Sequence, residues 1–406
     1  MPDPDRPSHA DDLRHFIDRH AHDLRGWLSD LIRARTVNPP GDEYLAAKVL
    51  TDFCDSCGIP YETFEKEVGR TNVVARIGSG RPRVLVPCHF DVVPAGDGWE
   101  TDPFEPVETG GRIYGRGAKD NKGPLAAMML AAAYLKDYEA DLTGQLILVG
   151  CADEEAGSGL GMMYLLAECG LEAECSIVPD AGHEMRLIDV GEKGALFMKA
   201  VAVGRQAHGS TPERGASALW PVLDFLGRIR QWRPPPPPES EATDLFTLAT
   251  LNIGAVHAGA VPNMVPGRCE ALIDVRYLPG ADGSGIIEHL RSELAAVEAA
   301  SDGVRMELEV MTHQLPTLVD TEGPLTRVLE RATERVTGIR PERYGQSGAT
   351  VAKFLILRGI PAVGFCCGPA GVAHVAGEWI ALDDVARFAE VMTLTILDLM
   401  AEAAYS

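Results

Sequence analysis

Five short motifs place acidic or imidazole side chains close to apolar stretches of the chain. Such side chains bind divalent metal ions, among them zinc, cobalt and manganese. The motifs contain His89 with Asp91, Asp120, the neighbouring Glu154 and Glu155, Asp180, and His374. Together they predict a site for divalent ions, in which a shared carboxylate could bridge two cations about 3.5–4 Å apart and activate a water molecule.

Each motif alone also has an ordinary structural interpretation. Asp120 could cap the helix that follows it, and the acids of Cys151–Gly159 could lie in a solvated turn.

Asp91 follows His89 by two residues at a strand end, so the acid could orient the imidazole while the other ring nitrogen binds a metal ion. In a pair of neighbouring carboxylates near metal ions, one can bind metal while the other acts as a general base. The combination of motifs therefore favours hydrolytic metal chemistry.

The elements that must position these motifs alternate between strands and helices. Apolar runs predict strands at 72–77, 83–89, 145–152, 175–179 and 360–366, and helical spacing predicts helices at 10–35, 43–57, 121–138, 159–168, 323–337, 348–357 and 383–402. This alternation predicts an α/β fold. Ligands of open α/β sheets bind outside the carboxyl ends of the strands, where nearly all of the motifs stand.

The pattern changes near residue 190. Strands are predicted at 194–203, 247–255, 268–276 and 304–311, and helices at 216–231 and 285–300. The order β-α-β-β-α-β is typical of a small ferredoxin-like α+β sandwich. We therefore predict a catalytic α/β domain formed by residues 1–190 and 313–406, interrupted by an inserted domain at residues 191–312.

Composition restricts the partners and the compartment. The 406 residues carry 37 basic and 59 acidic side chains, a formal net charge of −22, which argues against nucleic-acid and anionic-membrane binding. The N-terminal segment has no apolar signal region, and no apolar run reaches the ~18 residues that a membrane span needs. Nine scattered cysteines do not indicate a disulfide framework. We expect a cytoplasmic protein.

In order and spacing, the motifs resemble those of one enzyme family. The stretches HFDVVP, GDGWETDPFEPVETGGRIYGRGAKDNKG, DEEAGS, VPNMVPG and AHVAGEW are similar to motifs of the co-catalytic zinc aminoacylase and carboxypeptidase family. That family includes acetylornithine deacetylase, succinyl-diaminopimelate desuccinylase, aminoacylase, glutamate carboxypeptidase and bacterial dipeptidases. The resemblance implies a zinc-peptidase-like α/β catalytic domain with an inserted ferredoxin-like lid, through which the protein would form a homodimer.

The resemblance also implies a ligand set for two divalent ions, with zinc favoured and cobalt or manganese as alternatives. His89 and Asp180 would bind one ion, whereas Glu155 and His374 would bind the other. Asp120 would bridge the two ions.

Three further residues receive catalytic roles from the resemblance. Asp91 would orient His89. Glu154 would be the general base that deprotonates the bridging water and later protonates the leaving amine. His208, in the inserted lid, matches a histidine that reaches the partner's active site in dimeric members and supports the tetrahedral oxyanion.

Substrate contacts are implied mainly by residues of the inserted lid. Asn263 and Arg276 match residues that bind the substrate carboxylate, for which an arginine fork is well suited, although Arg276 could instead pair only with Asp274. The family's Gly-Gly-Thr-Ser-Asp loop lies on the substrate side. It corresponds here to GQSGATV, in which Gly348 is expected to contact substrate and Val351 replaces the acid.

The function expected from these residues is metal-dependent hydrolysis of the amide bond of N-acyl amino acids. A dipeptidase or carboxypeptidase of the same family is the alternative, with a short peptide as substrate. Because of the altered loop at Val351, a metal-binding protein without turnover is the alternative from another class.

Overall fold

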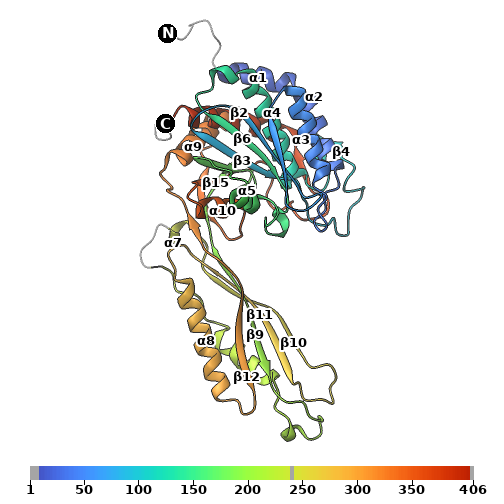
Figure 1. Cartoon of the computed structure of the whole chain (residues 1–406), viewed down its shortest axis with the longest axis vertical. Helices are drawn as coiled ribbons and strands as arrows, with labels where there is room; N and C mark the ends of the chain where they lie inside the picture. Colours follow the sequence, from blue (N-terminus) through green and yellow to red (C-terminus); the bar gives the residue numbers. More distant parts are fainter. Residues whose placement is uncertain (1–8, 238–241, 403–406) are drawn as a thin grey trace. The chain divides into compact units, whose positions relative to one another are not determined.

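The computed structural model describes residues 9–237 and 242–402, which divide into two compact units (Figure 1). Unit 1 contains the described residues up to Val190, together with Val319–Tyr344 and the described residues from Ala349 onward. Unit 2 contains Gly191–Leu318 and Gly345–Gly348. Residues 313–318 and 345–348 thus cluster with the inserted segment.

The sheet of unit 1 has four parallel strands at its centre. Its strands, in spatial order, are β1 (Tyr61–Glu65), β2 (Thr71–Gly78), β6 (Gln145–Cys151), β3 (Arg83–His89), β7 (Cys175–Val178), β15 (Ala362–Gly364), β8 (Leu187–Glu192) and β13 (Thr317–Leu318), with β14 (Glu342–Gln346) also paired to β8. Strands β6, β3, β7 and β15 are parallel, whereas β1, β2 and β8 join them antiparallel. The carboxyl ends of the four parallel strands therefore share one edge.

Helices cover both faces of this sheet. They are α1 (His9–Arg19), α2 (Ala21–Arg33), α3 (Tyr44–Cys57), α4 (Gly123–Asp137), α5 (Met162–Glu168), α9 (Pro324–Thr337), α10 (Val351–Leu357) and α11 (Leu382–Met400). Leu85 and Ile147 belong to a core cluster with α5 and α10. Because side chains alternate along a strand, their neighbours Val84 and Leu148 point to the opposite face, where α4 and α11 pack on the sheet. A small separate sheet contains β4 (Val107–Thr109), β5 (Arg112–Tyr114) and β16 (Trp379–Ala381).

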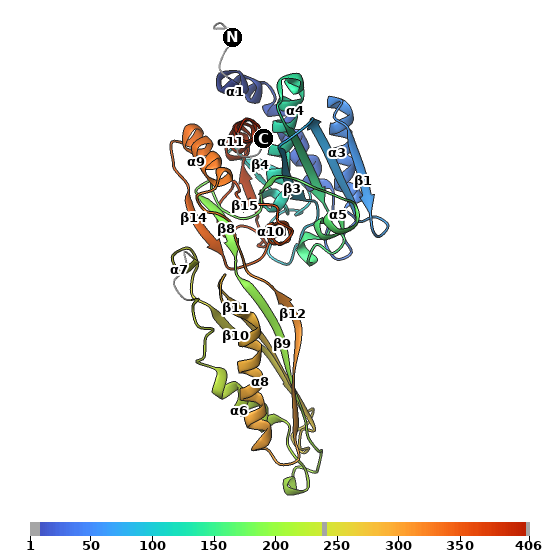
Figure 2. The same cartoon turned by 60° about the vertical axis from the view of Figure 1, so that its left-hand side comes forward.

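Unit 2 is a ferredoxin-like α+β sandwich, which confirms the predicted fold class. It contains β9 (Gly194–Val203), α6 (Leu219–Ile229), α7 (Ala242–Leu245), β10 (Thr250–Ala258), β11 (Arg268–Tyr277), α8 (Gly283–Ala299), β12 (Arg305–Gln314) and β13 (Thr317–Leu318). The antiparallel sheet has the order β10-β11-β9-β12. Helices α6 and α8 pack together on one of its faces (Figure 2).

Several element boundaries differ from the predictions. The helix expected over 10–35 is two helices, α1 and α2, separated at His20. Helix α10 begins at Val351 rather than at 348, because the Thr350 hydroxyl accepts a hydrogen bond from the Ala352 backbone N–H and caps the helix. Among the described residues, no helix combines the length and apolar composition needed to cross a membrane.

Candidate metal centre

His89 is the last residue of β3 and is almost fully buried. Its Nδ1–H donates to the backbone oxygen of Asp91 at 2.9 Å and lies 3.5 Å from Oδ1 of the Asp91 carboxylate. Because Nδ1 carries the proton in this arrangement, Nε2 is the nitrogen available to a metal ion. Nε2 lies 3.0 Å from Asp120 Oδ1 and 3.9 Å from Asp180 Oδ1.

Asp120 lies in an irregular helical turn, Ala118–Lys122, before α4. The turn begins at Gly117, whose φ is +86° and where a Cβ would lie 2.8 Å from Val92 Cγ1 and 2.9 Å from Lys122 Cδ. Glycine is therefore required at this position. The following peptide bond, Asp120–Asn121, is cis.

The two oxygens of Asp120 face different histidines. Oδ1 lies 3.0 Å from Nε2 of His89, and Oδ2 lies 3.2 Å from Nε2 of His374. Nε2 of His374 also lies 3.0 Å from Glu155 Oε1. A carboxylate with one oxygen toward each imidazole is suited to bridging two cations.

The predicted metal ligands thus converge into two groups that share Asp120. One group is His89, Asp120 and Asp180, and the other is Asp120, Glu155 and His374. Within each group the candidate ligand atoms all lie within 4.8 Å of one another. This mixture of imidazole and carboxylate donors fits a pair of divalent ions.

Asp91 contacts more than His89. Its carboxylate accepts hydrogen bonds from the backbone N–H groups of Glu154 (3.0 Å) and Glu155 (3.0 Å), and from Nδ2 of Asn38 (2.8 Å). Asp91 therefore ties the end of β3 to the turn that follows β6, and it sets the backbone position of both glutamates.

Three carboxylates of the centre, those of Glu154, Asp180 and Asp120, have pKa values shifted from their ordinary values. Burial, reinforced by the charge of Asp180, raises the pKa of Glu154 well above its ordinary value. Burial and the charge of Asp120 likewise raise the pKa of Asp180 to about 6. Burial would also raise the pKa of Asp120, but hydrogen bonds from His374 and His89 hold it well below its ordinary value. A buried acid with a raised pKa, such as Glu154, is suited to taking up and returning a proton.

We expect metal binding to release protons and to strengthen with pH. Hydrogen bonds to Asp120 and Glu155 raise the pKa of the His374 imidazole to about 10 without metal, so at neutral pH a proton must leave before a metal ion can bind. Because the proton competes below that pKa, the apparent affinity should rise about tenfold per pH unit for each proton released. Calorimetric titration in buffers of different ionisation enthalpy measures this. A His374→Ala chain should release one proton fewer, and equal release by both chains would contradict the assignment.

A buried ion pair, which the sequence did not predict, supports the backbone of Asp120. Glu378 Oε1 accepts hydrogen bonds from the backbone N–H groups of Lys119 (2.9 Å) and Asp120 (3.0 Å). Its Oε2 accepts from Nη1 of Arg116 at 2.7 Å, and both side chains are buried. Nη2 of Arg116 donates to the backbone oxygen of Ala95 at 3.0 Å. The sequence offers one indication of a role for Glu378, which is that this acid lies four residues after His374, a predicted metal ligand.

Four predicted residues belong to unit 2 rather than to the metal centre of unit 1. The Nδ1 of His208 accepts a hydrogen bond from the Ser210 backbone N–H at 3.1 Å. The proton of the neutral ring therefore lies on Nε2, which can donate to an anion. The backbone oxygen of Asn263 accepts from the N–H of Gly209 at 2.8 Å, so Asn263 lies beside the His208 turn.

Arg276 and Gly348 occupy other parts of unit 2. Arg276, on β11, donates from Nε to Asp274 Oδ1 at 2.8 Å, and its guanidinium lies 5.0 Å from the centre of the Phe197 ring. The pairing with Asp274 that the sequence suggested is therefore present. Gly348 lies just after β14.

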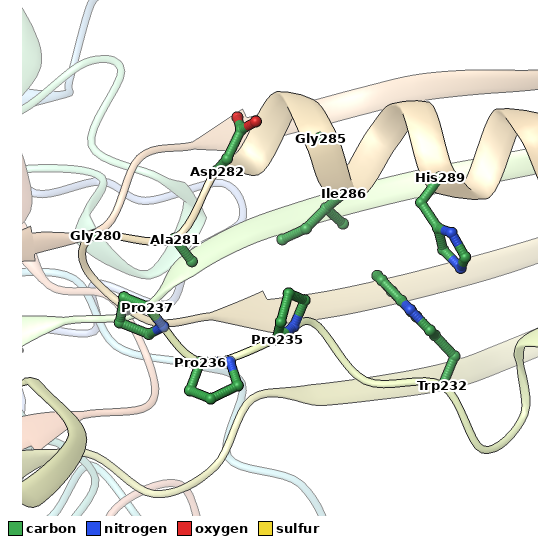
Figure 3. Close-up of a pocket in the computed structure, with 10 residues that line it drawn as sticks. All are labelled: Trp232, Pro235, Pro236, Pro237, Gly280, Ala281, Asp282, Gly285, Ile286 and His289. Carbon is green, nitrogen blue, oxygen red and sulfur yellow. The ribbon is translucent and has the colours of Figure 1, made fainter. Parts of the chain in front are cut away.

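Unit 2 also contains a pocket of about 460 Å³ (Figure 3). The rings of Trp232 and His289 stack on one another there, with centroids 4.5 Å apart. Asp282 is the acid of its lining, and its Oδ1 caps α8 by accepting from the Ser284 N–H at 3.0 Å. Among the described residues of this lining, one capping acid does not suit metal-dependent hydrolysis, so the candidate active site is the cluster of unit 1.

Comparison with known proteins identifies the family. The sequence model of the peptidase family M20/M25/M40 matches residues 85–398 of this chain. The chain belongs to this family. The family resemblance seen in the motifs is thereby confirmed, and as a member of the M20/M25/M40 family the protein is a metallohydrolase that acts on amide or peptide bonds. The family depends on two metal ions, in agreement with the two ligand groups that share Asp120.

Several relatives and structural neighbours have named activities. The chain is 31% identical over 337 residues to a succinyl-diaminopimelate desuccinylase of Acidiphilium cryptum, covering 80% of this chain and 85% of the relative. It is 29% identical over 403 residues to an acetylornithine deacetylase of Myxococcus xanthus, covering 92% and 96%. The structure of human carnosine dipeptidase 1 matches with a TM-score of 0.76 at 19% identity, covering 98% of this chain and 100% of the other.

Proposed function

We propose that this metallohydrolase is a deacylase that cleaves the amide bond of N-acyl amino acids. The observation that carries the proposal is the pair of ligand groups sharing Asp120, with Glu154 on the adjoining turn. The similarity to a desuccinylase and to an acetylornithine deacetylase over most of the chain supports this substrate class.

In the proposed centre, His89, Asp120 and Asp180 would hold one divalent ion and Asp120, Glu155 and His374 the other. Zinc is the proposed metal, because two histidines and three carboxylates match its ligand preferences. When bound, the ions would supply Lewis acidity that polarises the carbonyl and lowers the pKa of water.

The side chains of the protein would then perform the proton transfers. Glu154 accepts a proton from the attacking water and returns it to the nitrogen of the leaving amine as the C–N bond breaks. The raised pKa of Glu154 suits both steps, since the group must be a base first and an acid afterwards. His208 donates from Nε2 to the oxyanion of the tetrahedral intermediate, while Arg276 and Asn263 bind the substrate carboxylate.

The proposal is tested with a panel of N-acetyl, N-succinyl and N-formyl amino acids and dipeptides. Release of free amine is measured with added zinc or cobalt and again with a chelator. We expect chelator-sensitive cleavage, with acyl amino acids turned over fastest. Faster cleavage of dipeptides would favour the alternative of a dipeptidase, the activity named for human carnosine dipeptidase 1. Metal binding without cleavage of any panel member would instead indicate a protein without turnover.

We also propose a homodimer that forms through unit 2. In the described part of the sheet, β10 is an edge strand, and the backbone groups of an edge strand can pair with another chain. On α6, Trp220 and Leu223 are 65% and 40% exposed and lie three residues apart, so they share a face. An exposed apolar face and an unpaired strand edge are each typical of a subunit interface.

A complementation experiment tests the dimer and the role of His208 together. A His208→Ala chain mixed with a Glu154→Gln chain should regain activity if His208 acts on the partner's centre, because one site of each heterodimer then has both residues. Sedimentation first verifies that the chains are dimeric, and co-purification of two differently tagged chains verifies that heterodimers form. A monomer in solution would contradict the dimer, and verified heterodimers without recovery would show that His208 acts within its own chain.

A cytoplasmic location is part of the proposal. All nine cysteines are free thiols in the structure. Free thiols are typical of proteins from a reducing compartment.

A further inference from the structure

Glu43 and Arg70 form a buried ion pair next to the start of the turn that carries Glu154. Neither residue is a predicted metal ligand. The Glu43 side chain is completely buried at the start of α3, and the Arg70 side chain is 13% exposed. Arg70 donates from Nε to Glu43 Oε2 at 2.6 Å and from Nη2 to Oε1 at 2.8 Å. Removing two charges from water has a desolvation cost that their attraction offsets only in part. Stability alone therefore does not explain the pair.

The pair holds Asp153, the residue immediately before Glu154. The backbone N–H of Asp153 donates to Glu43 Oε1 at 3.1 Å, and Arg70 Nη2 donates to Asp153 Oδ1 at 3.0 Å. Asp153 has a φ of +64°, in the left-handed region that residues other than glycine seldom occupy. Contacts to both its backbone and its side chain fix this unusual conformation.

Asp153 in turn organises the loop that carries the glutamates. Its backbone oxygen accepts from the N–H of Ser158 at 2.6 Å, and its Oδ2 accepts from the N–H of Leu160 at 3.1 Å. Asn38 connects this side of the loop to Asp91, because its Nδ2 lies 3.3 Å from Asp153 Oδ1 and 2.8 Å from Asp91 Oδ2. Hydrogen bonds therefore hold this loop on both sides of Glu154, at Asp153 before it and at Ser158 and Leu160 after it.

We infer that Glu43 and Arg70 are positioning residues for Glu154, acting through Asp153. The inference rests on the proposed role of Glu154 as general base. Neither residue belongs to the two ligand groups. Their function is to hold the backbone from which the Glu154 carboxylate reaches the attacking water. A small displacement of a catalytic group strongly lowers the reaction rate, because a shift of about 1 Å can reduce the rate about 100-fold.

The test compares Arg70→Lys and Glu43→Gln with a matched pair elsewhere in the sheet. Arg83, at the opposite end of β3 from His89, binds Glu174 through the same two-point contact, with Nε–Oε2 at 3.2 Å and Nη2–Oε1 at 2.9 Å. Arg83→Lys is therefore the control for losing a two-point contact between an arginine and a carboxylate. For each chain we would measure kcat, KM, bound metal, and hydrogen exchange at the Ser158 and Leu160 amides.

We expect Arg70→Lys and Glu43→Gln to lower kcat by about 10- to 100-fold, with KM and metal content unchanged. The Ser158 and Leu160 amides should exchange at least tenfold faster in these chains, whereas Arg83→Lys should change neither quantity. In a Glu154→Gln background, adding Arg70→Lys should cost nothing further, because the positioned group has already been removed.

Unchanged kcat, or an equal loss in Arg83→Lys, would overturn the inference even if the amide hydrolysis itself is confirmed. A fall in kcat without faster exchange at the two amides would also overturn it. Absence of hydrolysis by the unmodified, metal-loaded protein would instead refute the proposed function. Exchange at the loop amides would then still decide whether the pair holds the loop.

Discussion

Replacing Glu154 with glutamine should lower kcat for amide hydrolysis by about 10²- to 10⁴-fold, the usual contribution of a general base. This corresponds to about 3 to 5 kcal/mol of lost transition-state stabilisation. Glutamine has the shape of glutamate but cannot accept the proton of the attacking water. Because Glu154 lies outside both ligand groups, the variant should still bind two metal ions.

The comparison with Glu155→Gln makes this prediction sharp. Glu155 is adjacent in sequence and its backbone N–H is held by the same Asp91 carboxylate, but its side chain lies 3.0 Å from Nε2 of His374. Glu155→Gln should therefore lose metal from one group, whereas Glu154→Gln should lose turnover with metal retained. Bound metal is measured by elemental analysis after dialysis at fixed free zinc. Full activity of Glu154→Gln would refute its role.

Replacing Asp120 with asparagine should weaken the binding of both metal ions. Asp120 is the residue common to the two ligand groups, with one oxygen facing each histidine. Loss of an outer contact to a metal ligand typically costs 10- to 100-fold in affinity, so loss of a shared ligand should cost at least about 100-fold at each group. Hydrolysis should consequently be lost at zinc concentrations that saturate the unmodified protein.

Asp180→Asn is the control, because Asp180 belongs to one group only. It should weaken one ion and leave the affinity of the other within a few fold. Metal titration followed by the thermal shift of each chain measures both affinities, since a ligand stabilises the folded state according to its concentration and dissociation constant. An Asp120→Asn chain that retains one tight and one weak ion, like Asp180→Asn, would show that Asp120 does not bridge.

The motifs of the sequence were sufficient to predict which residues gather in unit 1. His89 ends β3, the Glu154 turn follows β6 and Asp180 follows β7. The sequence patterns of these strands are nearly continuous apolar runs, which are typical of parallel strands buried on both faces. Since parallel strands end at one edge, side chains that follow them must meet there. The order of elements in unit 2 was equally readable, because a β-α-β-β-α-β string has few compact arrangements.

Short or polar elements could not be predicted in this way. Strand β14, with the sequence ERYGQ, and strand β8, with LIDVGE, lack a clear alternation of apolar and polar residues. Their hydrogen-bonding partners, rather than their own composition, make them strands. The break between α1 and α2 at His20 is of the same kind, since the helical spacing continues across it.

The sequence by itself determined the chemistry of the site, namely which acids and histidines could bind metal and where along the chain they stand. Only the tertiary structure decided which oxygen of Asp120 faces which histidine, and which buried charges support the loops. The Glu43–Arg70 pair spans 27 residues and the Arg116–Glu378 pair spans 262. Arginine and glutamate usually lie at the surface, so their types predict exposure. They are buried here because each finds its partner and the backbone N–H groups of a loop of the candidate metal centre only when the chain is folded.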